Sequence, residues 1–351
     1  MRCFILYASS KDANFYYMTR FKTTDPCIYL LCEDKTELLI VPKMELRRAE
    51  RESKVKELAS FEDLGYKEFI KKLDPKEAVL QVLIRILNEC KVKEVVVPEN
   101  FPAYYAFKLS ENFKIVFDNP VKKRRVIKSI SEINEIEKVA RKILETFDWL
   151  LKNFKFNRCE EVRRTVEMKL YEMGCLAEGT IASSGKISSD PHEIGRGKIE
   201  DHLVLDIFPK SLESLYYADF TRTIFLNKNL ELEEMFDAVL DAQSEALSMI
   251  KDGVNARDVH EMVKCKLEER GFKTDKGEGF IHSTGHGVGL EIHEEPRISE
   301  QNYTLRSGMV VTVEPGLYYR EVGGVRVEDL IVITKDGCKI LTDYEKKIKL
   351  F

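Results

Sequence analysis

The sequence lacks several features that would place it quickly in a class. It has no run of 18 or more apolar residues, so we expect no membrane-spanning helix. Its net charge is only −4, which provides no electrostatic basis for binding nucleic acid or an anionic membrane. Its eight cysteines include no Cys-x-x-Cys pair, so their spacing predicts neither a zinc ribbon nor a disulfide framework. We therefore expect mostly buried free thiols in a reducing cytoplasm.

What the chain does contain is enough apolar sequence for two folded domains. With 351 residues, 44% hydrophobic and 33% charged, it fits a globular protein whose halves each bury a core. We place the boundary near Pro120, with domains at 1–120 and 121–351. The basic run from Lys122 to Arg125 follows the boundary, and we expect a solvated linker rather than a nucleic-acid contact.

In the first domain, short apolar runs alternate with helical patterns. We expect strands at 2–8, 28–33, 36–41, 94–97 and 114–117, and helical segments within 43–72, 77–90 and 102–109. The opening run is a strand rather than a signal peptide, because no small-residue cleavage site follows it. This alternation predicts an α/β domain with a mixed sheet. It has no cluster of metal ligands and no Gly-rich phosphate loop, so we expect it to support, cover or dimerise.

The second domain shows signs of an internal repeat. Ser129-Ile-Ser-Glu132 has the form of a capping box and opens a helix that runs to about Leu151. Segments 157–174 and 255–271 resemble each other, and each ends at a glycine of the kind that follows a helix. Two pairs of strands come after them. In each pair an acid interrupts an apolar strand and a second acid lies on the next strand.

These acids are Asp206 and Asp219 in the first pair, and Glu314 and Glu328 in the second. Burying a lone carboxylate is costly unless it is paired or bound to a cation. For a single acid, an ion pair with an arginine of the same strands would be a sufficient explanation. Four acids in two similar strand pairs favour a metal site.

A histidine-rich loop lies between the two strand pairs. The chain has only six histidines, and His282, His286 and His293 fall within twelve residues. Histidine is a common neutral nitrogen ligand. The three glycines around His286 would let the backbone approach a ligand closely.

These residues resemble the motifs of the pita-bread metallopeptidases, which include methionine aminopeptidase, aminopeptidase P and prolidase. The Xaa-Pro peptidases are most similar, through Gly285-His-Gly-Val-Gly-Leu-Glu-Ile-His-Glu-Glu-Pro-Arg297, Glu314-Pro-Gly-Leu-Tyr318 and Gly324-Val-Arg-Val-Glu-Asp329. Asn14-Phe-Tyr-Tyr-Met-Thr-Arg20 resembles their creatinase-type amino-terminal domain. The resemblance implies a creatinase-like α/β domain with a mixed sheet. An α+β pita-bread catalytic domain with an internal pseudo-two-fold repeat would follow it.

The resemblance also implies a metal centre. Its ligands would be Asp206, Asp219, His286, Glu314 and Glu328, with Asp219 and Glu328 bridging two divalent ions. Asp206 would complete one ion, and His286 with Glu314 the other. Four carboxylates and one imidazole suit Mn, Co, Zn or Fe. Two such ions can share a hydroxide, with Glu314 as its general base or proton shuttle.

Further roles for histidines follow from the same resemblance. It implies catalytic, substrate-side positions for His192 and His293, and a position in the substrate pocket for His282. Without the resemblance each would be an ordinary surface or core histidine. That plainer interpretation is the one we keep for His202 and His260.

Two arginines complete the expected site. The resemblance to prolidases implies that Arg297 pairs with the free carboxylate of a dipeptide, a partner that its planar guanidinium suits. The alternative is a structural ion pair with Glu294 or Glu295. Arg326 lies two residues before Glu328, on the same strand face, and would support the site or contact the substrate.

In one place the sequence departs from the family pattern. Twelve residues separate Asp206 from Asp219, two more than is usual, with Pro209 early and Leu215-Tyr216 replacing a Gly-Tyr turn. Asp219 keeps its Asp-x-Thr-Arg-Thr context. We therefore expect the ligand to be retained and the rim of the pocket, with the substrate range, to differ.

The implied function is hydrolysis of the Xaa-Pro bond of dipeptides by a homodimeric, prolidase-type enzyme. Aminopeptidase P, acting on longer Xaa-Pro peptides, is the nearest alternative. A creatinase-type amidinohydrolase lacks the metal ligands, so the intact set of five argues against it. An alternative of another class is a catalytically silent pita-bread protein that acts as a binding module, which a measurement of metal content would distinguish. No nucleic-acid or membrane partner is expected.

Overall fold

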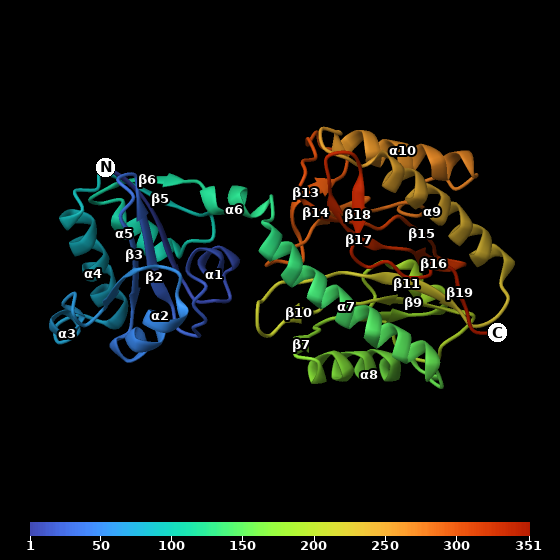
Figure 1. Ribbon diagram of the computed structural model, residues 1–351, viewed down its shortest axis with the longest axis horizontal. Helices are drawn as coiled ribbons and strands as arrows, with labels where there is room; N and C mark the ends of the chain where they lie inside the picture. The colour runs from blue at the N-terminus through green and yellow to red at the C-terminus, as the bar shows by residue number, and fades with distance from the viewer. The chain divides into compact units, whose positions relative to one another are not determined.

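The computed structural model describes residues 1–351, which divide into two compact units, Met1–Arg125 and Val126–Phe351 (Figure 1). The basic run that we expected to be a linker lies in helix α6 (Pro120–Arg125) of the first unit. Arg125 is buried there, and its Nη1 donates to Asn14 Oδ1 at 2.9 Å. For Arg125 the prediction of a solvated residue was therefore wrong, because a long-range hydrogen bond holds it inside.

A six-stranded mixed sheet forms the first unit, in the order β4-β3-β2-β1-β5-β6. Its strands are β1 (Arg2–Ala8), β2 (Cys27–Cys32), β3 (Glu37–Val41), β4 (Glu57–Ser60), β5 (Glu94–Val97) and β6 (Lys114–Phe117). The helices beside them are α1 (Ala13–Thr19), α2 (Leu46–Glu52), α3 (Tyr66–Phe69), α4 (Pro75–Glu89) and α5 (Ala103–Leu109). Strand β2 is antiparallel to β1 and β3, and the other pairs are parallel, which confirms the mixed α/β sheet.

Two expectations for this unit need correction. The segment 43–72 is not helical throughout, because β4 lies within it and pairs in parallel with β3. Cys3 and Cys32, which we expected to be free, form a disulfide because the register of β1 and β2 places them opposite each other. The other six cysteines are free, and Cys27, Cys159 and Cys175 among them are buried.

The second unit begins with two helices and contains two larger sheets, of which the five-stranded one is antiparallel and the four-stranded one is mixed. Helix α7 (Ile130–Lys152) starts at the predicted capping box of Ser129 and Glu132, and α8 (Cys159–Glu172) follows. A four-stranded sheet contains β8 (Ile181–Ser183), β9 (His202–Asp206), β11 (Thr221–Phe225) and β19 (Ile348–Lys349). It is mixed because β19 pairs in parallel with β11. A five-stranded sheet contains β12 (Gly285–Gly287), β13 (Glu294–Ile298), β14 (Val310–Val313), β17 (Asp329–Ile333) and β18 (Cys338–Ile340). The hairpin of β15 (Gly316–Tyr319) and β16 (Gly323–Arg326) and the pair β7 (Cys175–Leu176) and β10 (Lys210–Ser211) complete it.

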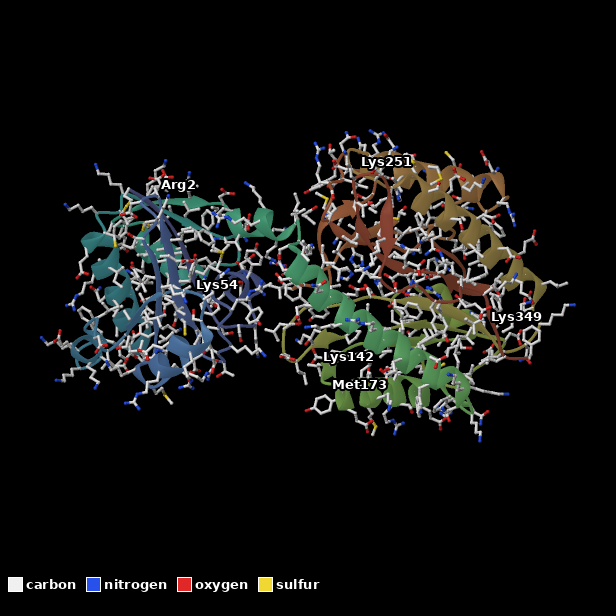
Figure 2. The ribbon with its side chains drawn as sticks, viewed as in Figure 1. Arg2, Lys54, Lys142, Met173, Lys251 and Lys349 are labelled. Atoms are coloured by element: carbon white, nitrogen blue, oxygen red, sulfur yellow. A yellow bond between two sulfur atoms is a disulfide. The ribbon has the colours of Figure 1, made fainter.

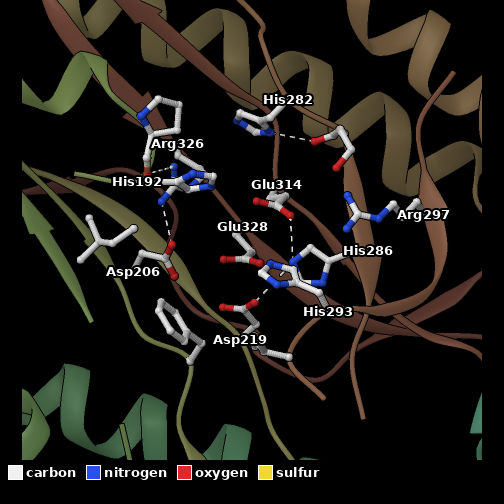
Figure 3. Close-up of a pocket in the computed structure, with 15 residues that line it drawn as sticks. His192, Asp206, Asp219, His282, His286, His293, Arg297, Glu314, Arg326 and Glu328 are labelled. Atoms are coloured by element: carbon white, nitrogen blue, oxygen red, sulfur yellow. Dashed lines mark hydrogen bonds and ion pairs between the residues drawn. The ribbon is translucent and has the colours of Figure 1, made fainter. Parts of the chain in front are cut away.

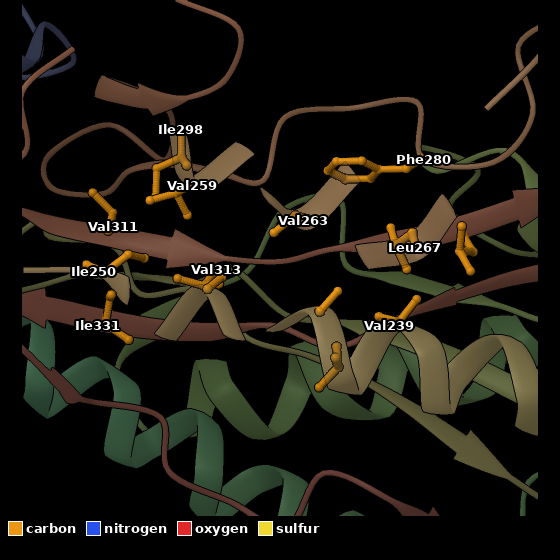
Figure 4. Packing of buried hydrophobic residues seen from close by; sticks show 14 of the residues in the cluster. Val239, Ile250, Val259, Val263, Leu267, Phe280, Ile298, Val311, Val313 and Ile331 are labelled. Atoms are coloured by element: carbon orange, nitrogen blue, oxygen red, sulfur yellow. The ribbon is translucent and has the colours of Figure 1, made fainter. Parts of the chain in front are cut away.

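Helices α9 (Leu230–Met249) and α10 (Ala256–Glu269) pack on the second half of this unit. Val239 and Val263 from these helices join Val311, Val313 and Ile331 from β14 and β17 in one buried cluster (Figure 4). Charged side chains such as Lys251 and Lys349 lie on the outside of the unit (Figure 2). The buried packing of β14 and β17 thus positions the residues that directly follow β14 and directly precede β17. No helix is long and apolar enough to cross a membrane.

The four acids occupy equivalent places in the two strand pairs. Asp206 is the last residue of β9, and Asp219 lies just before β11, with which β9 is antiparallel. Glu314 directly follows β14, and Glu328 directly precedes the antiparallel β17. Each strand pair therefore presents its two acids at the same end. The internal repeat itself stays an interpretation of this arrangement.

Candidate metal centre

The second unit contains a cavity of about 400 Å³ in which all ten predicted site residues meet (Figure 3). They are His192, Asp206, Asp219, His282, His286, His293, Arg297, Glu314, Arg326 and Glu328. Five further residues line the cavity without having been predicted: Ile181, Pro191, Phe208, Ser283 and Ile292. Three of these adjoin a predicted histidine, whereas no sequence signal distinguishes Ile181 or Phe208.

His286 lies at the centre of the predicted ligands. Its Nε2 is 3.2 Å from Glu314 Oε1 and 3.6 Å from Asp219 Oδ2. Its Nδ1 lies 3.2 Å from the carbonyl oxygen of Gly287, which accepts the ring N–H and leaves Nε2 facing the acids. Thr312 contacts both His286 and Glu314. Its Oγ1 accepts a hydrogen bond from the His286 backbone N–H and donates one to Glu314 Oε1.

The carboxylates are only partly satisfied by the protein. Asp206 Oδ1 and Glu328 Oε1 are buried and have no hydrogen-bond partner. Ligand atoms of Asp219, His286 and Glu328 all lie within 4.8 Å of one another. Unpartnered carboxylate oxygens are costly to bury, and oxygen and imidazole donors are those that divalent transition metals accept. The residues present therefore fit a divalent metal ion.

The electrostatics of the acids support the same conclusion. Burial raises the pKa of Asp219 and Glu328 well above the ordinary value, and neighbouring carboxylates raise it further. Burial also raises the pKa of Asp206, against the opposing effect of Arg326. Burial would raise the pKa of Glu314 too, but the hydrogen bond with His286 lowers it to about 2. A bound cation would allow all four acids to be ionised together.

Arg326 connects the predicted ligand Asp206 to Tyr318 and, through it, to His282. Its Nη2 donates to Asp206 Oδ2 at 2.7 Å, and its Nη1 donates to the hydroxyl of Tyr318 at 2.6 Å. That hydroxyl is 3.0 Å from His282 Nε2, and burial raises the pKa of Tyr318 to about 12. We assigned Tyr318 no role from sequence, although it ends the Glu-Pro-Gly-Leu-Tyr motif.

His192, His293 and Arg297 lie on the exposed side of the cavity. The His293 ring is 4.3 Å from that of His286, centre to centre, and partial burial together with this neighbour lowers its pKa to about 4. Arg297 faces His286 in the register of β13 and β12 and forms no ion pair. Of its two expected alternative partners, Glu294 instead binds Lys128 Nζ at 2.6 Å, in a buried ion pair.

The other two histidines lie outside the cavity. His202 is fully buried, with Nε2 3.0 Å from both Ser188 Oγ and Gly324 O. His260 Nδ1 is 3.0 Å from Thr284 Oγ1. Both are core histidines, as the plainer interpretation had them.

The longer segment between Asp206 and Asp219 folds against its surroundings. Lys210 and Ser211 pair with β7, and Leu215 adopts a positive φ of 61° where the chain turns. The backbone N–H of Tyr217 then donates to the carbonyl of Gly289 at 2.8 Å, next to the histidine loop. The segment therefore packs against β7 and the histidine loop, and no residue from 209 to 218 lines the cavity.

Comparisons with known proteins extend over nearly the whole chain. Residues 131–335 match the sequence model of "Metallopeptidase family M24", and residues 6–114 match that of "Creatinase/Prolidase N-terminal domain". The Xaa-Pro dipeptidase of Pyrococcus furiosus is 33% identical over 97% of this chain and 93% of its own length. Among solved structures, the X-Pro aminopeptidase from Thermotoga maritima has a TM-score of 0.86 and 27% identity, covering 100% and 98% of the two chains. The prolidase from Pyrococcus furiosus has a TM-score of 0.82 and 28% identity, covering 98% and 97%.

Proposed function

The chain belongs to metallopeptidase family M24 and is a metal-dependent hydrolase; on that premise we propose that it cleaves the Xaa-Pro bond of dipeptides. Its similarity to Xaa-Pro dipeptidases over 97% of the chain supports this substrate class. The structural observation that carries the proposal is the cavity itself. It combines the donors for a divalent metal with an arginine that forms no ion pair.

We assign two divalent ions to the five predicted ligands, with Mn, Co, Zn and Fe as the candidates. Asp219 and Glu328 would contact both ions, Asp206 one, and His286 with Glu314 the other. The unpartnered oxygens of Asp206 and Glu328 support this assignment. Such ions, when bound, supply a hydroxide at neutral pH and stabilise the charge of a tetrahedral intermediate.

The protein's own groups would move protons and hold the peptide. Glu314 is a carboxylate that is ionised at neutral pH, and it would accept a proton from the attacking water. His293, whose pKa is lowered to about 4, is neutral there and would hydrogen-bond to the scissile amide. His192 and His282 would contact the substrate from the other positions of the cavity wall. Arg326 would hold Asp206 in place through its 2.7 Å ion pair.

Arg297 would select for dipeptides. In an Xaa-Pro dipeptide the free carboxylate is on the proline itself, so a cation beside the metal centre can reach it. A guanidinium binds a carboxylate through two parallel hydrogen bonds, which orients the proline as well as attracting it. In a longer peptide this position would hold an uncharged amide.

Aminopeptidase P activity is the second candidate, because the fold matches an X-Pro aminopeptidase with a TM-score of 0.86. The silent binding protein has no such support, since the cavity retains all five predicted ligands. We also propose a homodimer and a cytoplasmic location. Both stay predictions, the first testable by light scattering.

The deciding experiment uses protein stripped of metal and refilled with Mn²⁺ or Co²⁺. Met-Pro, Met-Pro-Pro-Gly and Met-Ala would be offered as substrates, with bound metal measured in parallel. Cleavage confined to Met-Pro would support the dipeptidase. Preference for the longer peptide would establish the aminopeptidase instead. No cleavage of any of the three by protein with two bound metals would sink the Xaa-Pro assignment.

A further inference from the structure

Behind the predicted ligands lies a fully buried polar cluster centred on Arg222, a residue for which the proposed chemistry has no use. The side chains of Arg222 and Asp329 are completely inaccessible to solvent. A guanidinium has five N–H donors, and here each one has an acceptor. Nε donates to Glu345 O, Nη1 to Thr221 O and Glu328 O, and Nη2 to Asp329 Oδ1 and Tyr344 O, at 2.5 to 3.0 Å.

This cluster holds Glu328 by three separate contacts. The Glu328 backbone N–H donates to Thr221 O at 3.1 Å, and the Thr221 hydroxyl donates to Glu328 Oε2 at 2.6 Å. Arg222 Nη1 donates to the Glu328 carbonyl oxygen. Only Oε1 of this carboxylate is left without a partner. Because Asp219 is two residues before Thr221, one short stretch of chain positions both acids.

The carboxyl-terminal segment 344–346 also contacts Arg222 and Asp329. Tyr344 and Glu345 supply the carbonyl oxygens that Arg222 binds, and Lys346 Nζ lies 2.8 Å from Asp329 Oδ2. Strand β19 then pairs in parallel with β11, and Figure 1 shows β19 near the terminus marked C. The last residues of the chain are thus attached to the strand that follows Asp219.

We propose that Arg222, Asp329 and the segment 344–346 are positioning residues for the metal centre. They set the distance between Asp219 and Glu328 without touching an ion. A buried ion pair can often be replaced by apolar residues without loss of stability, so stability alone does not account for one with every donor satisfied. The need to keep Asp219 and Glu328 at a fixed distance does account for this buried ion pair. Two ions that share both ligands would tolerate little displacement of either carboxylate. The proposal rests on the proposed function only in that this site holds divalent ions.

The test measures binding of Mn²⁺ by isothermal titration to the full chain after treatment with a chelator. Arg222→Lys keeps the charge and loses the planar fork, and we expect it to weaken Mn²⁺ binding by about tenfold or more. Lys346→Met should cause a smaller loss in the same direction. Lys347→Met is the matched control, since the neighbouring Lys347 binds Asp237 on α9, outside the cluster. It should bind Mn²⁺ as the wild type does.

A purely structural role would give a different pattern. The temperature of unfolding of the metal-free variants would fall, while their Mn²⁺ affinity and stoichiometry stayed at the wild-type values, and the proposal would be overturned. If Arg222→Lys does not fold, the comparison of Lys346→Met with Lys347→Met decides in the same way. Failure of the wild type to bind Mn²⁺, Co²⁺, Zn²⁺ or Fe²⁺ would instead overturn the proposed function, and the positioning proposal with it.

Discussion

His286 Nε2 lies 3.2 Å from Glu314 Oε1, and one threonine hydroxyl, that of Thr312, contacts both residues. The pairing of β12 with β14 brings these residues together from different parts of the chain. The resulting ion pair keeps Glu314 ionised, because it lowers the pKa of this acid to about 2. In the metal-free protein this contact therefore keeps Glu314 in the anionic form that a cation binds.

Glu314→Gln should accordingly be nearly inactive. The amide keeps the size of the side chain and cannot accept a proton, so we expect kcat on Met-Pro to fall by about 10²-fold or more. Loss of a ligand charge should also reduce the bound metal. Glu295→Gln is the control, since Glu295 lies in β13 of the same sheet as β14 but does not line the cavity. A Glu314→Gln protein with wild-type kcat would contradict the role of this residue.

Bound metal should stabilise the folded protein. The ligand atoms of Asp219, His286 and Glu328 converge only in the folded chain, so an ion binds the native state and not the unfolded one. At a free Mn²⁺ concentration 100 times the dissociation constant, the free energy of unfolding should rise by about 2.7 kcal/mol. Differential scanning calorimetry with increasing Mn²⁺ measures this as a rising temperature of unfolding.

Asp219→Asn should lose most of that stabilisation, whereas Asp190→Asn, which changes an acid outside the cavity, should keep it. Activity should be lost on treatment with a chelator and return with added metal. An unfolding temperature that does not respond to Mn²⁺, Co²⁺, Zn²⁺ or Fe²⁺ would argue against a metal centre at these residues.

The parts of the site that could be predicted are those in which a polar or charged residue stands in an otherwise apolar segment of the sequence. Asp206 and Glu314 stand out because each ends or follows an apolar strand, where a carboxylate is costly. The helix at Ser129 was predictable because a capping box is a local signal. Such patterns involve residues close together in the sequence, and the same local arrangements are found in the folded chain.

The parts that could not be predicted depend on the register between distant segments. The guanidinium of Arg222 pairs with the carboxylate of Asp329 rather than with that of a predicted ligand, and Tyr318 joins Arg326 to His282, only because separate strands are aligned in that way. The same holds for the disulfide in the first unit and for β4. Strand β4 has only four residues, too few for an alternating pattern, and its pairing with β3 determines its conformation.

Arg297 should determine the preference for a free carboxylate. Replacing it with Gln leaves a neutral hydrogen-bond donor and removes one charge-assisted hydrogen bond worth about 1.5 to 3 kcal/mol, so kcat/KM for Met-Pro should fall about 10- to 100-fold. Met-Pro amide has no carboxylate, and the variant should hydrolyse it as the wild type does. Arg306→Gln is a suitable control, because Arg306 is exposed and faces Asp252 rather than the cavity. An equal loss on both substrates would mean that Arg297 does not bind the carboxylate.

His202 should make the protein sensitive to acid independently of the metal centre. Ser188 Oγ donates to Gly185 O, so the His202 Nε2–H is the donor to Ser188 Oγ and Gly324 O. The other ring nitrogen, Nδ1, is buried without a partner and would have to accept the second proton. Burial consequently lowers the pKa of His202 from 6.5 to about 4.

Because the folded pKa is the lower one, the unfolded chain takes up a proton first as the pH falls. The contribution of neutral His202 to stability is complete above pH 6.5 and is lost between 6.5 and about 4. At pH 5 the loss should amount to about 2 kcal/mol. His202→Gln cannot titrate. The free energy of unfolding of this variant minus that of the wild type should therefore be larger at pH 5 than at pH 7.5.

The comparison needs a variant that disturbs the same place without removing the titrating group. Ser188→Ala removes one acceptor from His202 and should lower the unfolding temperature at both pH values. Calorimetry of the three metal-free proteins at pH 5 and 7.5 separates the two effects, because the acids of the metal centre titrate alike in all of them. If His202→Gln differs from the wild type by the same amount at both pH values, His202 does not account for the acid sensitivity. Because the buried Nδ1 of the wild type takes up a proton only at a cost, we expect the unfolding temperature of His202→Gln to rise relative to that of the wild type on going from pH 7.5 to pH 5.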